Sequence, residues 1–243
     1  MTQPAPNRLF AAMDTTWPPA RLIDFGPWKL REGLGGGQRV SAATVCDHVT
    51  ESDIENAESE MRSLAQRPLF MVRPEDTALD TWLAARGYQT VDPVTIYLAP
   101  SKALTQTLER SAVIPVWPPL AAQKELWANA GIGPARLAVM QRCTTPRTAL
   151  LARQKDAPAG TAFVAIDGDI AMLHALEVVP DLRKLGVGTR VMQGAANWAL
   201  ARNATWLALA VVNANGPANA LYRKLGFTMA TAYHYRRAPE ALT

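Results

Sequence analysis

The sequence predicts a mixed α/β protein made of two related halves. Short apolar runs typical of strands follow one another and then alternate with segments of helical periodicity, as in α/β architectures. Two segments also repeat the order strand, helix, Gly-aromatic pair and strand without a gap, at a constant offset that carries Gly87 onto Gly226. The 243 residues, 49% of them hydrophobic, are enough to bury a core in one large domain or in two small ones.

The first half, residues 1–103, begins with a proline-containing segment that predicts no regular structure. Its expected elements are strands at 28–31 and 39–45, a helix from 50 to about 66, a strand at 69–72, a helix at 76–86 and a strand at 90–98. Thr50 or Ser52 can cap the first of these helices, and Gly87 closes the second. Pro93 favours an edge position or a bulge for the last strand, because proline has no N–H to donate to a neighbouring strand.

The second half, residues 104–243, follows a proline-rich transition at 100–117. Its expected elements are helices at 119–129 and 134–141, strands at 148–154, 161–166 and 170–179, a helix at 188–202, a strand at 206–212, a helix at 217–225 and a strand at 227–236. The composition of the transition predicts a domain boundary near residue 104.

The charge balance suggests an anionic partner, and a small phosphorylated ligand explains it as well as a nucleic acid does. The net charge is +4, with 10 basic and 13 acidic residues before position 104 and 15 basic and 8 acidic residues from there on. This excess in the second half is modest for a nucleic-acid-binding protein, whose basic residues usually cluster. Two cysteines and three scattered histidines predict no metal site and fit a reducing cytoplasm. No apolar run approaches the roughly 20 residues of a membrane span, and we expect neither a membrane partner nor a signal peptide.

The most informative segment is the turn between the strand that ends at Pro180 and the helix that begins near Gly188. Residues 183–190 read RKLGVGTR, so the turn combines glycines with basic side chains. It can present several backbone N–H groups in one direction, beside the positive end of the helix dipole, and so bind a pyrophosphate, with Arg183, Lys184 and Arg190 at the rim. The alternative is an ordinary turn whose glycines relieve strain. The nucleoside-triphosphate motif GxxxxGK[ST] and the Rossmann motif GxGxxG are both absent from the sequence.

Three motifs in order resemble the GNAT superfamily of acyl-CoA-dependent N-acyltransferases. Arg183-x-x-Gly186-x-Gly188 matches the family's [QR]-x-x-G-x-[GA] signature, and Leu176-x-Val178-x-Pro180 resembles the strand before it. The segment 215–227, which ends in LYRKLGF, resembles a later family motif, and the resemblance extends over residues 104–237. It implies a mostly antiparallel, splayed sheet flanked by helices. It also implies transfer of an acetyl group from acetyl-CoA to a primary amine of a small molecule, amino acid or peptide, with CoA as the other product and no metal.

The resemblance also assigns roles to individual residues. Free backbone groups of Leu176 and Val178 would pair with the pantetheine arm of acetyl-CoA, as an added strand does. Asn215 would hydrogen-bond to the same arm, and Ala218 is small enough to let it pass. Tyr222 would protonate the departing thiolate as a general acid, although an aromatic helix residue can also simply cover a core. The pyrophosphate would be held by Arg183, Lys184, Leu185, Gly186, Val187, Gly188 and Thr189.

The first half resembles a degenerate, truncated copy of the same fold. At the offset that relates Gly87 to Gly226, Leu83 stands where Tyr222 stands in the second half. Residues 44–49 stand where the phosphate-binding turn begins, and they contain no glycine. We expect this half to keep the fold, to have lost the cofactor, and to shape or cover the acceptor pocket, as in tandem members of the superfamily.

A general base is expected near the splayed strand, since the attacking amine must lose a proton directly or through water. His174 is the first candidate, because imidazole changes its charge near neutral pH and strand alternation places it on the same face as Leu176 and Val178. The strand resembles that of the aralkylamine N-acetyltransferases, in which a histidine at this place is implicated as the base, although Met172 replaces a second histidine. Glu177 is the other candidate, and it faces the opposite way unless a bulge reverses the alternation. The N–H of Leu176 is the simplest donor to the oxyanion.

The acceptor site is the part that the sequence defines least. Trp28, Arg31 and Arg39 can line a pocket, in which arginine pairs with a carboxylate and Trp stacks on a flat or cationic group. Alternatively, Trp28 belongs to the core and both arginines are solvated. Two further functions stay open beside the N-acetyltransferase. A non-catalytic acyl-CoA-binding or regulatory module is favoured if His174 is buried and no acceptor cavity exists beside Tyr222. The basic second half leaves nucleic-acid binding as the third possibility.

Overall fold

The structure is a computed structural model that describes residues 2–109 and 111–240. The helices are α1 (Pro6–Thr16), α2 (Glu51–Ser63), α3 (Thr77–Ala85), α4 (Ser101–Leu104), α5 (Ala121–Asn129), α6 (Pro134–Arg142), α7 (Val187–Leu200) and α8 (Gly216–Lys224), with short 3₁₀ helices η1 (Gln38–Val40) and η2 (Pro180–Leu182). The strands are β1 (Arg21–Phe25), β2 (Trp28–Glu32), β3 (Thr44–Val45), β4 (Leu69–Val72), β5 (Gln89–Pro100), β6 (Val113–Val116), β7 (Arg147–Gln154), β8 (Ala157–Asp167), β9 (Ile170–Val178), β10 (Trp206–Val212) and β11 (Thr228–Arg237).

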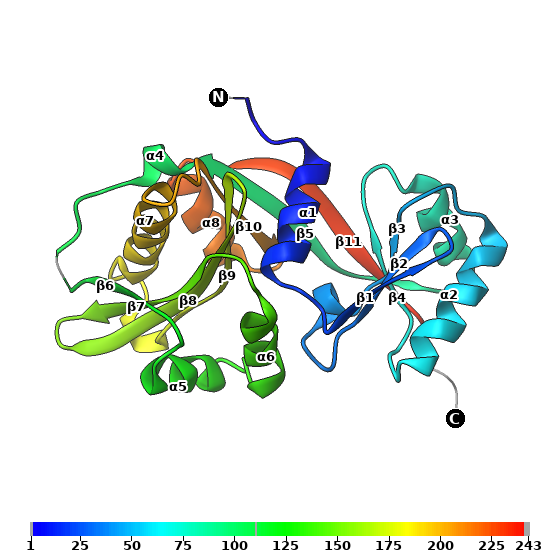
Figure 1. Cartoon of the computed structure of the whole chain (residues 1–243), viewed down its shortest axis with the longest axis horizontal. Helices are drawn as coiled ribbons and strands as arrows, with labels where there is room; N and C mark the ends of the chain where they lie inside the picture. The colour runs from blue at the N-terminus through cyan, green and yellow to red at the C-terminus, as the bar shows by residue number, and fades with distance from the viewer. Residues whose placement is uncertain (1, 110, 241–243) are drawn as a thin grey trace.

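One large sheet runs through the whole molecule. Its eight strands follow the order β4-β11-β5-β10-β9-β8-β7-β6, while β1, β2 and β3 form a second, three-stranded sheet (Figure 1). Every pairing between neighbours in the large sheet is antiparallel except that of β9 with β10. The predicted mixed, mostly antiparallel sheet flanked by helices is therefore confirmed.

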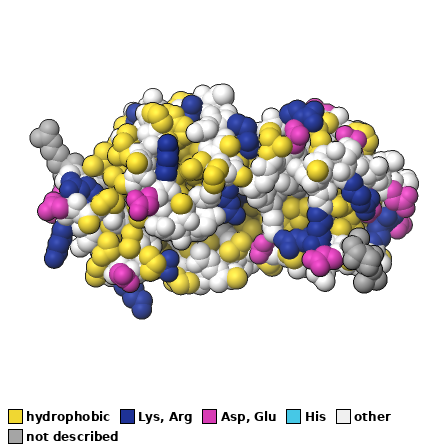
Figure 2. Space-filling model, turned by 90° about the horizontal axis from the view of Figure 1, so that it is seen from below, with side chains coloured by type: hydrophobic (Ala, Val, Ile, Leu, Met, Phe, Trp, Pro, Cys, Tyr) yellow, Lys and Arg dark blue, Asp and Glu magenta, His cyan; other side chains and the backbone are white. Residues whose placement is uncertain are grey.

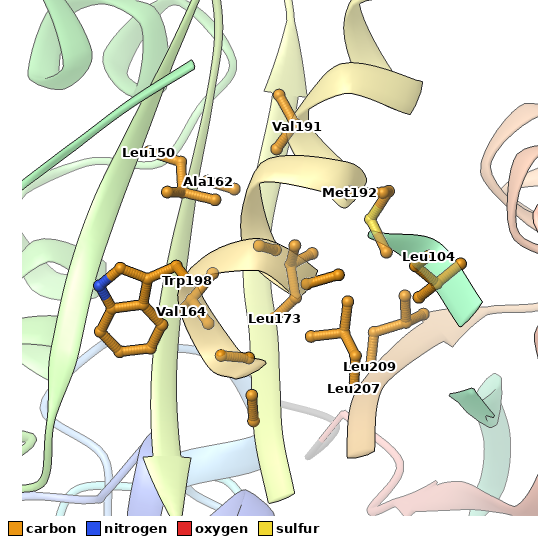
Figure 3. Packing of buried hydrophobic residues seen from close by; sticks show 14 of the residues in the cluster. Leu104, Leu150, Ala162, Val164, Leu173, Val191, Met192, Trp198, Leu207 and Leu209 are labelled. Carbon is orange, nitrogen blue, oxygen red and sulfur yellow. The ribbon is translucent and has the colours of Figure 1, made fainter. Parts of the chain in front are cut away.

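Helices cover both faces of the large sheet. Successive side chains of β9 and β10 enter two different apolar cores, because neighbouring residues of a strand point to opposite faces of the sheet. On one face, Val191, Met192 and Trp198 of α7 pack with Leu173 and Leu209 (Figure 3), and α8 joins this core. Helices α1, α5 and α6 lie on the other face (Figure 1). Among the described residues, no helix has both the length and the apolar character required to span a membrane.

The first half departs from the sequence-based expectation at two places. Residues 6–16 form α1 instead of an irregular segment, since Pro6 occupies the first helical turn, where its missing N–H costs nothing. Leu9 and Met13, one helical turn apart, are fully buried against the large sheet. The strand expected at 39–45 is wrong, because the chain forms η1 and then only the two-residue strand β3. The expected helices and the other expected strands are present, whereas β1, β6 and α4 were not anticipated.

The internal repeat is present as an exchange of strands between the two halves. The offset that relates Gly87 to Gly226 carries α3 onto α8 and the start of β5 onto the start of β11. The two halves exchange these last strands, since β5 lies between β10 and β11 and β11 lies between β4 and β5. The registers agree residue by residue: Val211 opposite Thr95 has its counterpart in Val72 opposite His234. Strand β5 of the first half pairs with β10 of the second, so the large sheet continues across the predicted boundary at 103/104. The division into two domains therefore stays a prediction.

Pro93 lies inside the large sheet, although proline usually avoids such positions. The pairing of β5 with β11 shifts register between Tyr233 and Tyr235, whose partners are Val94 and Val91. Pro93 thus falls within a bulge, where the ladder is already interrupted and no N–H is required. Of the two positions expected for this residue, the bulge is the one observed.

Each exchanged strand is held by a polar side chain of the helix in the half that receives it. In the first half, Asp80 of α3 accepts hydrogen bonds from Arg236 at 2.7 and 3.1 Å and contacts His234 at 2.8 Å, both on β11. In the second half, Asn219 of α8, which the offset relates to Asp80, accepts a hydrogen bond at 3.2 Å from the hydroxyl of Tyr97 on β5. These equivalent anchors fix the two exchanged strands in register.

Replacing Asp80 by Asn is expected to destabilise the protein by about 1–3 kcal/mol at pH 7, because the largely buried Arg236 would lose its carboxylate partner. The hydrogen bond from Arg236 lowers the pKa of Asp80, against the opposing effect of burial and with a smaller contribution from His234. The stabilisation is therefore complete above about pH 4, the unfolded-state pKa, and is lost as the pH falls through the lower folded-state pKa. Urea unfolding from pH 7 to pH 3 measures it.

The matched control is Asp24→Asn, which removes the exposed partner of Lys29 and should leave stability nearly unchanged. An Asp80→Asn protein as stable as the wild type at pH 7, or a difference between the two that grows as the pH falls, would contradict the role of Asp80.

Candidate active site

A cleft opens in the large sheet where β9 and β10 diverge. The two parallel strands pair only from Trp206 opposite Ile170 to Leu209 opposite Leu173, although both continue further. Ala175, the second residue beyond the last pair, has a φ of +51°, and its carbonyl accepts a hydrogen bond at 2.8 Å from the indole of Trp127. Beyond Leu173, no described strand pairs with the edge of β9 that faces β10. Backbone groups of this edge are therefore available to an extended ligand.

The bulge at Ala175 reverses the alternation of side chains along β9. His174 lies opposite Phe163 and Glu177 opposite Thr161, so that three steps along β9 match two along β8. His174 and Glu177 consequently share the face covered by α1, α5 and α6. Leu176 and Val178 pack into the core beneath α7 on the other face. The expectation that His174 shares a face with Leu176 and Val178 is wrong for this reason.

His174 is enclosed in a network that joins both halves of the chain. The ring is 4% exposed, stacks on Trp17 at 4.9 Å, and contacts Thr16 Oγ1 through Nε2 at 2.9 Å and Arg39 Nη1 through Nδ1 at 3.1 Å. Because arginine can only donate, Nδ1 is the acceptor and Nε2 carries the proton. Burial, reinforced by the charge of Arg39, holds the pKa of His174 well below its usual value. The lone pair that a general base requires is thus occupied.

Glu177 lies half-buried at the end of β9, within the cleft. Burial raises the pKa of this carboxyl above its ordinary value, while the positive charges of Arg183 and Arg136 limit the increase. A carboxylate whose pKa is raised accepts a proton more readily than an exposed carboxylate. Glu177 therefore has the position and the acidity required of a general base.

Tyr222 of α8 lies within the core on the α7 face, close enough to Glu177 for the charge of that carboxylate to act on its hydroxyl. Its ring is 5% exposed and packs against Tyr97 and Phe227. Burial, with a smaller contribution from the charge of Glu177, raises its pKa well above 10. The hydroxyl has no hydrogen-bond partner among the described residues, and it is not one of the polar atoms sealed from solvent. The phenol thus keeps its proton and is free to donate it to a ligand.

The predicted phosphate-binding turn has the required backbone geometry. Lys184 and Gly186 both have positive φ, and Gly186 precedes the first residue of α7 without any side-chain cap. The N–H groups of the first turn, from Val187 to Thr189, are left for a ligand. A Cβ on Gly188 would come within 3.1 Å of Leu221 Cδ2, so any side chain here would require Leu221 to shift. Arg183, Lys184 and Leu185 are exposed at the rim of the turn.

Two polar residues of the expected cofactor site have partners within the protein. Asn215 caps α8 through its side-chain oxygen, which accepts a hydrogen bond from the N–H of Ala218 at 3.2 Å, so its amide NH₂ remains for a ligand. Arg190 donates to the carbonyls of Leu185 at 3.1 Å and Arg153 at 3.4 Å. The guanidinium of Arg190 therefore supports the turn, and its expected contact with a phosphate stays a prediction.

The structure separates the three residues suggested for the acceptor pocket. Trp28 is 1% exposed in the core of the first half, where its indole donates to the carbonyl of Asp53. Arg31 forms a two-point ion pair with Asp14, at 2.7 and 3.1 Å, and is 3% exposed. Only Arg39 reaches the cleft, through its contact with His174.

Other cleft residues were not anticipated from the sequence. Trp17, Arg136, Tyr233 and Tyr235 line a cavity of about 320 Å³ together with Arg39 and His174. They come from α1, α6 and β11, which lie far apart in the chain, and no local pattern distinguishes them from ordinary core or surface residues. Only the arrangement of α1 and β11 in space brings them together.

A splayed antiparallel sheet with an uncapped, glycine-containing turn at the head of its central helix defines the GNAT fold. Residues 116–227 match the model of the Acetyltransferase (GNAT) family. Over 240 residues the chain is 26% identical to the uncharacterized N-acetyltransferase YobR of Bacillus subtilis (strain 168), covering 95% of this chain and 96% of that protein. The chain is therefore similar to the GNAT superfamily of acetyltransferases over residues 116–227.

Solved structures with the same fold extend over both halves of the chain. A GCN5-related N-acetyltransferase from Kribbella flavida is similar with a TM-score of 0.70 and 17% identity, covering 96% of this chain and 95% of that one. A tandem GNAT protein from the clavulanic acid biosynthesis pathway is similar with a TM-score of 0.60 and 16% identity, covering 82% of this chain and 76% of that one. The family as a whole supports acyl-CoA-dependent acetyl transfer to an acceptor.

Proposed function

We propose that the chain transfers the acetyl group of acetyl-CoA to a primary amine of a small molecule, amino acid or peptide and releases CoA. The observation that carries this proposal is the cleft between β9 and β10, which has Glu177 on one side and the hydroxyl of Tyr222 on the other. A carboxylate that can take a proton and a phenol that can give one are the two groups that acyl transfer to an amine requires.

The residues of the cleft fit the pantetheine arm and the pyrophosphate of acetyl-CoA. The unpaired edge of β9 at Leu176 and Val178 suits the amide groups of the pantetheine arm, which would lie in the gap as an additional strand. Ala218 and the NH₂ group of Asn215 lie at the start of α8, beside this gap. The turn made of Arg183, Lys184, Leu185, Gly186, Val187, Gly188 and Thr189 offers backbone N–H groups and two exposed cations to the pyrophosphate.

In the proposed reaction, side chains from the two faces of the sheet carry the two proton transfers. Glu177 takes a proton from the amine, directly or through water, as the nitrogen forms a bond to the thioester carbonyl carbon. The N–H of Leu176 donates to the oxyanion that forms. The hydroxyl of Tyr222 gives its proton to the sulfur as the carbon–sulfur bond breaks, so that the products are the N-acetylated amine and CoA. Of the two predicted bases, we assign the role to Glu177, because the accepting nitrogen of His174 already binds Arg39.

The first half is proposed as a degenerate GNAT-like domain that contributes to the acceptor pocket. Leu83, which takes the place of Tyr222, is fully buried in the core of this half. The observation that supports a role in the pocket is the contact between Arg39 of the first half and His174 of the second.

A non-catalytic acyl-CoA-binding module is the second candidate function, and the burial of His174 favours it. The cavity beside β9 favours the enzyme, as does the carboxyl of Glu177, which has no hydrogen bond or ion pair with any described residue. Nucleic-acid binding has less support, because Lys and Arg side chains on the face drawn in Figure 2 are scattered and mixed with Asp and Glu.

Replacing Tyr222 by Phe tests the proposed function. We expect the kcat for thiol release from acetyl-CoA with an amine acceptor to fall by about tenfold to a hundredfold, since sulfur would leave without its proton donor. The Kd for acetyl-CoA should change by less than about threefold, because the ring and its packing against Tyr97 and Phe227 remain.

The matched control is Tyr88→Phe, which removes a hydroxyl bound to Glu58 in the first half and should leave kcat unchanged. Full turnover of Tyr222→Phe under conditions in which the chemical step is rate-limiting would refute the acid role. Absence of acetyl-CoA-dependent thiol release with every amine, in a protein that binds acetyl-CoA, would instead favour the non-catalytic module.

A further inference from the structure

The cavity beside β9 is built by both halves of the chain. Its volume is about 320 Å³, and it lies on the face of the sheet opposite α7, next to the bulge at Ala175. Trp17 and Tyr233 supply aromatic walls, while two guanidinium groups, those of Arg39 and Arg136, supply positive charge. An amine that enters from this face would meet Glu177, which lies two residues beyond Ala175 on β9 and on the same face as the cavity.

The guanidinium of Arg39 is held on one side by a hydrogen bond and lines the cavity on the other. Its Nη1 donates to His174 Nδ1 at 3.1 Å, and His174 in turn is held through Nε2 by the hydroxyl of Thr16, which donates to the carbonyl of Ala12. Its Nε is buried without a partner among the described residues. The hydroxyl groups of Tyr233 and Tyr235 also interact with the guanidinium, and Nη2 is not one of the buried unpaired atoms. The group is therefore an incompletely satisfied cation, oriented by a chain of hydrogen bonds.

Arg136 faces the same cavity from α6. Its guanidinium approaches Gly37, where a Cβ would lie 3.5 Å from Nε, and it has no hydrogen bond or ion pair with any described residue. Its charge reaches Glu177, because it counteracts the increase in the pKa of that carboxyl. Arg136 thus lines the cavity and lies near the proposed base.

The balance of charge in the cavity calls for an anion. Among the described residues that line it, Asp92 is the only carboxylate, and it is exposed and makes no ion pair with either arginine. Aromatic walls lower the local polarity, which increases the cost of leaving the guanidinium of Arg39 without a counter-charge, while the exposed Arg136 adds a second positive charge at the cavity. Arginine binds a planar carboxylate through two parallel N–H donors, a geometry that it also offers to phosphate groups.

We propose that Arg39 and Arg136 bind a carboxylate of the acceptor, so that the acceptor is a primary amine that also carries a carboxylate. This inference rests on the proposed acetyl transfer and names the class of its substrate. The carboxylate between the two arginines would orient the amine toward Glu177. His174 then acts as a positioning residue, because it holds Arg39 and does not touch the reacting atoms.

The test compares acceptors that differ only in the carboxylate. Thiol release from acetyl-CoA is measured with glycine, L-glutamate, L-phenylalanine and L-tryptophan, with the corresponding amino acid amides, and with O-phosphoethanolamine. We expect kcat/KM for at least one acid to exceed that of its amide by on the order of tenfold to a hundredfold, as for a charge-assisted hydrogen bond.

Variants then assign the preference to the cavity. Arg136→Gln should raise KM for the preferred acid by on the order of tenfold or more, with little change in kcat, and should bring the acid and its amide close to equality. Arg39→Lys, which keeps a positive charge but loses the planar donors, should reduce the preference in the same way. Lys124→Gln on the exposed face of α5 is the matched control and should leave the preference unchanged.

The outcomes separate the inference from the proposed function. Equal use of acids and amides, preference for O-phosphoethanolamine, no turnover of any acid by a protein that binds acetyl-CoA, or an unchanged preference in folded Arg136→Gln would each overturn the inference. Failure of the wild type to bind acetyl-CoA would overturn the proposed function itself.

Discussion

Replacing Glu177 by Gln is expected to lower the kcat of acetyl transfer by about 10²–10³-fold, the usual contribution of a positioned general base. The amide has nearly the same size as the carboxyl group, so the bulge at Ala175 and the pairing with Thr161 should remain. Steady-state thiol release at saturating acetyl-CoA measures the change. The matched control is Glu125→Gln, at an exposed position of α5, which should retain full kcat.

The dependence of activity on pH tells which side chain takes the proton. Burial raises the pKa of Glu177, and a base works only when ionised, so kcat/KM of the wild type should fall as the pH decreases through a value above about 4.3, the ordinary pKa of Glu. This limb should be absent in Glu177→Gln. In His174→Gln the limb should persist, and the main effect should be a higher KM for the acceptor, because Arg39 loses its support. The assignment is wrong if the limb disappears with His174 and survives the loss of Glu177.

Replacing Gly188 by Glu is expected to abolish acetyl-CoA binding, with a loss of affinity of more than about a hundredfold. Even a Cβ at this position would lie 3.1 Å from Leu221 Cδ2, and the carboxylate would put negative charge where the pyrophosphate is proposed to bind. Calorimetry with acetyl-CoA measures the loss. Gly133→Glu is the matched control, because Gly133 has negative φ and a Cβ added there would meet no atom within 4 Å, and it lies at the start of α6, away from the turn.

An intermediate variant separates crowding from charge. Gly188→Ala adds only the Cβ, which the flexible end of Leu221 can accommodate by a small shift, so a several-fold loss of affinity is expected in place of abolition. Normal acetyl-CoA affinity in folded Gly188→Glu would remove the turn at the head of α7 from the binding site.

The sequence was informative where function depends on consecutive residues. The turn at 183–189, its two glycines and the helix after it form a local unit, and the structure contains that unit where it was expected. The internal repeat predicted the relation between α3 and α8, because a strand, a helix and a Gly-aromatic C-terminus recur with the same spacing. The repeat did not predict that β5 and β11 change places, since either partner satisfies the same alternation of apolar residues.

The active site was harder to predict for two reasons: it depends on a one-residue bulge in β9, and it depends on contacts between segments far apart in the chain. Regular alternation placed Glu177 away from His174, and the bulge at Ala175 put both on one face. Arg39 and His174 lie 135 positions apart, and nothing near either residue indicates the other. The sequence gives no reason to prefer Arg39 to Arg31 as a pocket residue. In the structure, however, Arg31 forms an ion pair with Asp14 within the first half.

The most direct test of the central claim is isothermal titration of the folded wild-type protein with acetyl-CoA. The cleft between β9 and β10 and the turn before α7 predict saturable binding of one molecule per chain, with a Kd between about 1 μM and 1 mM. Heat no greater than that of dilution at millimolar acetyl-CoA, from protein with an intact cooperative unfolding transition, would contradict it.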